Sequence, residues 1–302
     1  MPINSGSFAK LLWPGLNKIY GKSYNEHPEE WSDLFDYNKS TKQYEEDLGV
    51  SSFGLATRKA EGGAVEYDEE RQAFLTRYTH VVYGKGFIIT REIYEDDQYG
   101  VVGNRRAQGL AFIMRQTKET LAANIYNRGF NSSYTGGDGK EMLATDHPLH
   151  AGGTASNELA TAADLSEAAL EQLCIDIMNT ENDKGLKIAI MPKTLIIPTA
   201  LVFEAERILG STARVATADN DLNALKSMGK FPGGIKVNHY LTDSDAFFIR
   251  TNCPEGMKMY QRRKMEFTID NDFDTENAKF KATERYSFGW TDWRGIFGSP
   301  GA

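Results

Sequence analysis

The sequence predicts an α+β protein built along one very long helix, with strand-rich segments before and after it. Apolar residues recur at steps of three and four through residues 97–128, the spacing that places them on one face of an α-helix. Residues 73–94 are instead rich in β-branched and aromatic side chains, and residues 258–269 and 278–289 alternate in polarity, and both patterns are typical of strands. No internal repeat, coiled-coil pattern or low-complexity segment interrupts this order.

The long helix is expected to determine the shape of the molecule. Asp96 or Asp97 can cap its start, and Gly129 stands where a left-handed C-cap is expected. Three glycines weaken its first turns, so the firm part is expected from about Asn104. A helix of this size reaches roughly 45–50 Å at about 1.5 Å per residue, which predicts a flat, extended molecule. Its apolar stripe comprises Leu110, Met114, Thr117, Leu121 and Ile125.

Two segments with different patterns precede the helix. Residues 1–48 carry scattered aromatic side chains and one short helix signal near Trp31, so we expect an arm that lies across its own chain or a neighbour. Residues 49–94 are expected to form a long hairpin, with strand alternation from Phe53 to Thr57 and a tip at Gly62–Gly63. A hairpin of this length cannot bury both of its faces in its own protomer.

The chain after the helix alternates between short helices and strands. Helices are predicted at residues 167–179, capped by Asp164 or Ser166, and at 199–209. Short strands are predicted at residues 186–190, 194–197, 236–240 and 246–250. Two long antiparallel strands are predicted at 258–269 and 278–289, and an acidic turn joins them.

Composition excludes several classes of protein. The chain is 40% hydrophobic and 25% charged, as is ordinary for a globular protein, and no apolar run approaches the 18 residues of a membrane span. The first residues lack an apolar stretch after a basic start, so no secretory signal is expected. The net charge of −8 argues against a dedicated nucleic-acid binder. Cys174 and Cys253 lack metal-ligand spacing and are expected to be free thiols in a reducing cytoplasm.

One cluster resembles a catalytic or metal site. Asp146, His147 and His150 lie close together, but Pro148 prevents the two histidines from sharing a helical face. A hydrogen-bonded structural loop is therefore preferred, and an intracellular hydrolase or transferase that uses Asp146 and His147 is the alternative. No catalytic residue, cofactor or metal is predicted.

The acidic turn has the alternating spacing of a calcium loop but lacks two of its required residues. Thr275 stands where the loop needs Gly, and Lys281 stands where it needs Glu. The turn is therefore expected to be solvated or to lie at an intersubunit contact. The glycine runs T-G-G-D-G-K and P-G-G lack the strand and helix of a phosphate loop, so they are interpreted as turns.

Several motifs occur in a consistent order through the last two thirds of the chain. Residues 124–157 contain N-x-Y-N-R-G-F-N, D-G-K, T-D-H-P-L and G-G-T-x-S-N. M-P-K-T-L-I-I-P, N-D-L-N-A-L, Y-L-T-D-S-D-A-F-F and F-G-W-T-D-W-R-G-I-F-G-S follow between residues 191 and 299. In these motifs the chain resembles the Mu-like major head subunit family of tailed phages, which are major capsid proteins of the Hong Kong 97-like fold.

The resemblance implies a structural subunit that self-assembles, as hexamers and pentamers, into an icosahedral shell around double-stranded DNA. It implies assembly in the host cytoplasm, location in the virion, no membrane contact and no sequence-specific contact with DNA. Separate scaffold, portal and decoration proteins are possible partners. An encapsulin-like cargo shell, which shares the fold, is a further alternative. The implied parts are an N-terminal arm (1–48), an extended hairpin loop (49–94), a peripheral domain with a spine helix (95–153), an axial domain (154–252) and a C-terminal strand pair shared between both domains (253–302).

Charge and position identify the surfaces expected to meet neighbouring subunits. In the implied fold the acidic turn lies where three subunits converge, and its acids would repel their copies unless cations of neighbouring hairpins pair with them. The predicted intersubunit contacts are Arg58, Lys59, Gly62, Gly63, Arg71, Arg77, Asp270, Asp272, Asp274 and Glu276.

Overall fold

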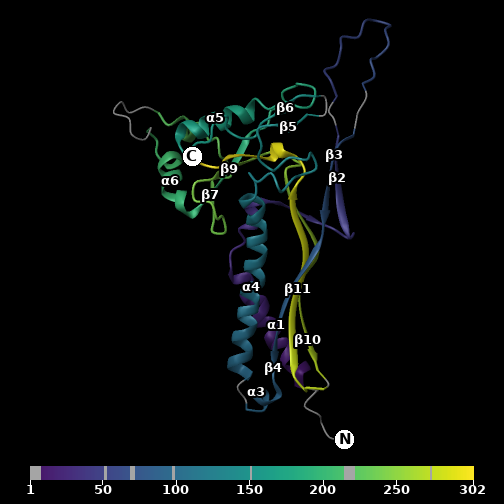
Figure 1. The fold of residues 1–302 in the computed structure, drawn as a ribbon, viewed down its shortest axis with the longest axis vertical. Coiled ribbons are helices and arrows are strands. Elements are labelled where there is room, and N and C mark those ends of the chain that lie inside the picture. The colour runs from purple at the N-terminus through teal and green to yellow at the C-terminus, as the bar shows by residue number, and fades with distance from the viewer. Residues whose placement is uncertain are drawn as a thin grey trace.

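The molecule is elongated, with a compact part at one end of a long stalk (Figure 1). The computed structural model describes residues 8–50, 53–68, 72–96, 99–149, 152–213, 222–272 and 274–302. In the stalk, α4 (Tyr99–Asn127), β10 (Met257–Asn271) and β11 (Ala278–Trp290) run side by side. The β10–β11 turn lies at the far end of the stalk, and residues 53–68 project beyond the compact part as a thin loop.

A four-stranded sheet in the order β1-β10-β11-β4 forms one side of the stalk. β10 and β11 are antiparallel, β1 (Asp36–Lys39) runs parallel to β10, and β4 (Val81–Ile89) runs antiparallel to β11. The long strand pair is therefore confirmed. Along β11 buried and more exposed residues alternate, so one face of the sheet packs on the helices.

The spine helix α4 is confirmed, with its first residue close to the predicted start. Its apolar residues divide between two cores: Leu110 and Met114 lie in the core at the far end of the stalk, and Tyr126 lies in the core near the compact part. The predicted left-handed C-cap is wrong, because Gly129 is not among the described residues with positive φ. A Cβ at Gly129 would lie 2.8 Å from Met142 Cε and 3.0 Å from Tyr126 O, so close packing explains the glycine.

The N-terminal segment differs from the prediction, because α1 (Phe8–Glu26) is a helix of 19 residues. It packs along α4, where Leu16, Tyr20 and Tyr24 are buried at helical spacing. The Tyr20 ring stacks on Phe267 of β10 with ring centroids 4.6 Å apart. A short helix, α2 (Trp31–Leu34), follows as predicted.

The hairpin region contains two paired strands, and the first of them lies before the position that the sequence predicts. β2 (Tyr44–Val50) pairs antiparallel with β3 (Gln72–Thr79), and their pairing slips between Leu48 and Val50. The predicted strand from Phe53 to Thr57 is wrong, because residues 53–68 are exposed and form no ladder. The strand lies just before them, in an acidic stretch whose composition disfavours strands. After β3 the chain enters β4 and so joins the stalk sheet.

The compact part contains a second four-stranded sheet, in the order β12-β9-β7-β8, with α5 and α6 beside it. Ser166 caps α5 (Glu167–Met178) as predicted, accepting the Ala169 N–H at 3.2 Å. The predicted strand at 186–190 is wrong, because Ala189 adopts φ 52° and only Lys187 forms a bridge, to Glu181. The sheet strands are β7 (Pro192–Pro198), β8 (Ile235–Asn238), β9 (Phe247–Thr251) and β12 (Ile296–Ser299).

The remaining elements are short. They are α3 (Arg91–Glu95), β5 (His147–Pro148), β6 (Thr154–Ala155), η2 (Thr199–Leu201), α6 (Val202–Gly210), α7 (Ala224–Ser227) and η3 (Trp293–Gly295). Within the described ranges, no helix has the length and apolar character that crossing a bilayer requires.

Candidate intersubunit surfaces

The projecting loop, residues 53–68, carries the predicted tip contacts and is exposed throughout. Gly62 adopts φ 77°, a conformation that favours glycine, and the Gly63 N–H donates to Ala60 O at 3.0 Å. The predicted turn at the tip is therefore present. Arg58 and Lys59 stand immediately before it.

Large apolar side chains of the projecting loop have little cover from their own chain. Tyr67 is 92% exposed and Leu55 is 79% exposed, and Phe53 and Val65 are each more than half exposed. Two hydrogen bonds hold the arms of the loop together: the Gly54 N–H donates to Asp68 Oδ2 at 2.7 Å, and the Thr57 hydroxyl donates to Glu66 Oε2 at 2.8 Å. The projecting loop is thus held in shape by its own hydrogen bonds, while its apolar side chains stay exposed to water in the single chain.

A polar cluster anchors the root of the hairpin to the stalk sheet. Asp47 of β2 accepts hydrogen bonds from Lys258 Nζ at 2.7 Å, Tyr260 Oη at 3.0 Å and Thr291 Oγ1 at 2.9 Å. Burial alone would raise the pKa of Asp47, but these hydrogen bonds hold that pKa below its ordinary value. Acidic residues are unusual in strands, so the sequence pattern does not identify Asp47 as an anchor.

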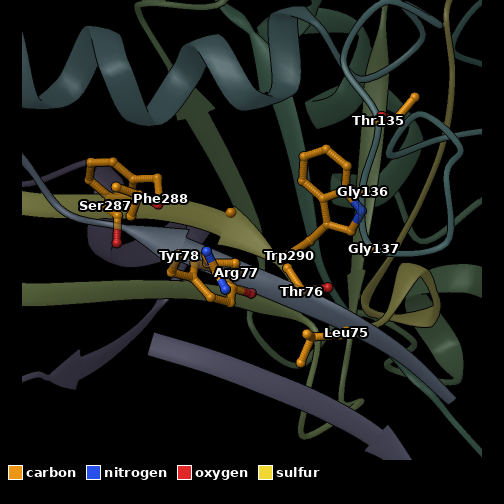
Figure 2. A pocket seen from close by; sticks show the side chains of 12 residues that line it. Leu75, Thr76, Arg77, Tyr78, Thr135, Gly136, Gly137, Ser287, Phe288 and Trp290 are labelled. Atoms are coloured by element: carbon orange, nitrogen blue, oxygen red, sulfur yellow. The ribbon is translucent and has the colours of Figure 1, made fainter. Parts of the chain in front are cut away.

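Beside this anchor is a hollow of about 350 Å³, formed where β3 crosses the end of β11 and the loop at residues 135–137 (Figure 2). The Trp290 indole lies next to Gly136, and Thr76 and Leu75 of β3 lie beside Gly137. Two glycines permit this crossing. A Cβ at Gly137 would lie 2.5 Å from Thr76 Oγ1, and a Cβ at Gly136 would lie 2.7 Å from Trp290 Nε1.

The acidic turn at the far end of the stalk has cationic partners in its own chain. Asp272 pairs with Lys279 at 2.5 Å, and Glu276 pairs with Arg91. Asp274 is exposed, and Asp270 stands opposite Lys279 in the strand register. The turn therefore has cations beside it in a single subunit.

The predicted cationic partners lie elsewhere. Arg77 pairs with Glu46 at the hairpin root at 2.6 Å, and Arg71 lies outside the described residues. Arg58 and Lys59 belong to the projecting loop, at the opposite end of the molecule from the acidic turn (Figure 1). The predicted pairing of these groups therefore requires two copies of the chain, and it stays a prediction.

The loop of Asp146 and His147 is held by hydrogen bonds, as the preferred interpretation of the sequence expects. His147 is fully buried, with Nδ1 2.7 Å from Asp138 Oδ2 and Nε2 3.1 Å from Asn157 Oδ1. Its ring stacks on Trp293 at 4.9 Å with an interplanar angle of 7°. Asp146 instead pairs with Lys140 at the surface. His150 lies outside the described residues, and no metal-binding group of three His, Cys, Asp or Glu occurs within the described ranges.

Asn157 holds this loop to the end of the chain and was not singled out from the sequence. Its side-chain NH₂ donates to Met142 O at 2.9 Å, Trp293 O at 3.2 Å and Ile296 O at 3.0 Å. Its Oδ1 accepts the Ala144 N–H at 2.9 Å. Asn157 is the last residue of the G-G-T-x-S-N motif, so this motif was the sequence signal from which its role could have been found.

The two cysteines are free thiols, as expected. Burial raises the pKa of Cys174 to about 11. Burial and the nearby Asp292 carboxylate raise the pKa of Cys253 to about 12. Both thiols therefore stay protonated at neutral pH and are poor nucleophiles.

Comparison with known proteins supports a capsid subunit. The phage capsid protein family matches residues 74–298, which is most of the chain. The fold is shared with a virus-like particle from Pyrococcus furiosus (13% identity, 95% of this chain and 98% of that chain, TM-score 0.57). It is also shared with the procapsid of bacteriophage JBD30 (14% identity, 98% and 76%, TM-score 0.54) and with Mycobacterium phage Che8 (12% identity, 90% and 92%, TM-score 0.53).

At these identities the likeness to solved structures concerns the fold alone, and no curated protein matches the chain. The predicted Hong Kong 97-like fold is confirmed, while the narrower Mu-like assignment stays a prediction. The enzyme and encapsulin-like alternatives find no support in these comparisons. The match over residues 74–298 shows that this chain belongs to the phage capsid protein family and is a structural major capsid protein.

Proposed function

We propose that this protein forms the icosahedral shell of a phage head, as hexamers and pentamers that enclose double-stranded DNA. The projecting loop carries the proposal, because its apolar side chains are exposed in the single chain yet held in an ordered hairpin. A neighbouring copy that covers Leu55 and Tyr67 would remove this apolar surface from water. Contacts of this head-to-tail kind close into rings when the rotation between copies permits.

Each part of the chain has a proposed role in the shell. Residues 1–48 act as the arm, 49–94 as the loop that reaches over an adjacent subunit, and 95–153 as the peripheral domain around the spine helix. Residues 154–252 act as the axial domain, and 253–302 join the two domains. The continuity of β10 and β11 along the stalk supports this joining role.

The proposed partners are further copies of the chain, together with separate scaffold, portal and decoration proteins. Packaged DNA would be enclosed without sequence-specific contact, which agrees with the net charge of −8. Assembly is proposed to take place in the host cytoplasm, with no catalytic step by this chain.

Negative-stain microscopy and analytical ultracentrifugation of the purified full chain test the proposal. We expect closed shells of several megadaltons, and a small oligomer under all conditions would contradict the proposal. Deleting residues 58–71 is expected to leave a folded subunit, by circular dichroism, that no longer closes shells. Loss of the folded monomer would instead show that the hairpin belongs to the core of its own protomer.

A further inference from the structure

An acidic strap, residues 29–36, joins the spine helix to the sheet of the compact part. It follows α1 and contains α2, and its four carboxylates contact three cations and one histidine outside the strap. The pairs are Glu29 with Arg115 (2.6 Å), Glu30 with His239 (2.6 Å), Asp33 with Lys236 (3.0 Å) and Asp36 with Arg250 (2.5 Å). The strap is therefore held on two sides. Arg115 of α4 binds it on one side, and Lys236 of β8, His239 and Arg250 of β9 bind it on the other.

Trp31 fastens the centre of the strap to the spine helix. Its ring is buried, with Lys118 Nζ 4.7 Å from the ring centroid. Its backbone N–H donates to Glu119 Oε2 at 2.7 Å. This hydrogen bond links the strap directly to a carboxyl group in the interior.

Glu119 lacks a cation of its own in the described structure. It is 1% exposed, and its second oxygen, Oε1, has no hydrogen-bond partner among the described residues. The neighbouring cations are engaged elsewhere: Arg115 bonds Glu29 and Tyr24 O, and Lys118 lies 2.8 Å from Glu284. A buried carboxylate in this position is costly when ionised and tolerable when neutral.

We propose that Glu119 makes the strap a pH-responsive latch: the strap stays closed over the neutral carboxyl group, and ionisation, which leaves an unpaired charge in the interior near the Glu29 and Glu30 carboxylates, loosens it. On ionisation the proton passes to solvent, and an unpaired negative charge remains beside Trp31. This device belongs to the single chain and does not depend on shell assembly.

The surroundings of Glu119 favour this behaviour. Burial raises the pKa of Glu119 to about 7, and the Glu30 and Glu29 carboxylates add to the rise, whereas the Trp31 N–H and Arg115 oppose it. A carboxyl group with a raised pKa stabilises the folded state most at low pH, and that stabilisation is lost as the pH rises from about 4.5 to about 7.

Other titratable groups lie near Glu119, and their effect on the pH dependence must be distinguished from that of Glu119. Tyr286 and Glu284 of β11 lie on its sheet side, and Tyr240 lies on the side of the compact part. Tyrosines ionise far above neutral pH, and Glu284 is paired with Lys118. His239 contacts Glu30 and is the histidine of this set, so it requires its own variant.

Hydrogen–deuterium exchange of the full chain between pH 5 and pH 8.5, corrected for intrinsic rates, tests the proposal. We expect protection of residues 29–36 to fall roughly 70-fold and to level off above about pH 7, while residues 169–177 of α5 stay constant. In Glu119→Gln the fall should disappear. In His239→Gln it should persist.

Three outcomes would overturn the proposal. They are a strap whose protection does not change with pH, an unchanged fall in Glu119→Gln, and loss of the fall in His239→Gln. If Glu119→Gln does not fold, the pH profiles of the wild type and of His239→Gln test the proposal. Ionisation of Glu119 predicts that the protection of residues 29–36 still falls with pH in His239→Gln, and loss of that fall would contradict it.

Discussion

Lys118 of the spine helix and Glu284 of β11 form an ion pair of 2.8 Å that is almost completely buried, with 4% and 1% of their side chains exposed. Gln261 Nε2 also donates to Glu284 at 2.6 Å, and the Tyr24 hydroxyl donates to it at 3.2 Å. The Glu284 carboxylate therefore receives one donor from α1, one from α4 and one from β10. These three elements meet at this single group in the stalk.

Replacing Lys118 by Met is expected to destabilise the chain by about 3–5 kcal/mol, because it leaves the Glu284 carboxylate buried without its cation. Urea unfolding of the full chain followed by circular dichroism measures the change. Lys22→Met is the matched control, since the Lys22 side chain is 79% exposed and its loss should cost less than about 0.5 kcal/mol. The double variant Lys118→Met with Glu284→Gln should recover part of the loss, and a Lys118→Met protein as stable as the control would contradict the role of the pair.

Asp47→Asn should weaken the hairpin root in a pH-dependent way. At pH 7 we expect a loss of about 1–3 kcal/mol, because Lys258, Tyr260 and Thr291 lose a charged acceptor. The pKa of Asp47 is lowered in the fold, so its stabilisation is present above about pH 4 and is lost as the pH falls further. Urea unfolding at pH 7 and pH 3 should therefore show a difference between wild type and variant that shrinks in acid. An equal difference at both pH values would show that the charge of Asp47 does not matter.

Leu55→Ser combined with Tyr67→Ser should abolish shell closure without unfolding the subunit. Both side chains are exposed in the single chain, so their loss costs the monomer less than about 0.5 kcal/mol. Between copies, the same change removes the apolar groups that a neighbour is proposed to cover. Particle yield by ultracentrifugation is the measurement, and Ala56→Ser, also exposed, is the control. Normal shells from the double variant would show that the tip is not an apolar contact.

Replacing Asp270, Asp272 and Asp274 by Asn should weaken assembly while leaving the monomer folded. The acids would face copies of themselves within a Debye length of about 8 Å, so they require cations. Lys279 supplies one within the chain, and the prediction holds that neighbouring subunits supply more. Particle yield and salt resistance measure the effect, with Glu206→Gln on α6 as a control. If both properties are unchanged in the triple variant, the turn is merely solvated and Lys279 and Arg91 suffice for it.

Elements with a strong local pattern were predictable from the sequence. The stripe of α4 and the alternation of β10 and β11 depend on residues close together in the chain, so both were found. In α1, Pro14, Gly15 and Gly21 reduce helix propensity, and packing against α4 and β10 overrides it.

The candidate surfaces were predictable only where backbone chemistry determines them. The tip at Gly62 follows from the tolerance of glycine for positive φ. Arg115, Lys118 and Glu119 instead look like an ordinary polar face of a helix. Their burial depends on the strap, about 90 residues earlier, and on β11, more than 160 residues later. No local pattern contains that information.

Gly136 and Gly137, at the root of the hairpin, determine the angle at which the hairpin leaves the stalk. Along β3 (Gln72–Thr79) the hairpin extends roughly 26 Å at about 3.3 Å per residue, so a tilt of about 5° moves one end of the strand by about 2 Å relative to the other. A methyl group at Gly137 would collide with Thr76 Oγ1 and Leu75 O and would force such a tilt. The direction of the hairpin is therefore determined in part by glycines, which have no side chain. A substitution there would misdirect the tip while leaving every residue of the tip unchanged.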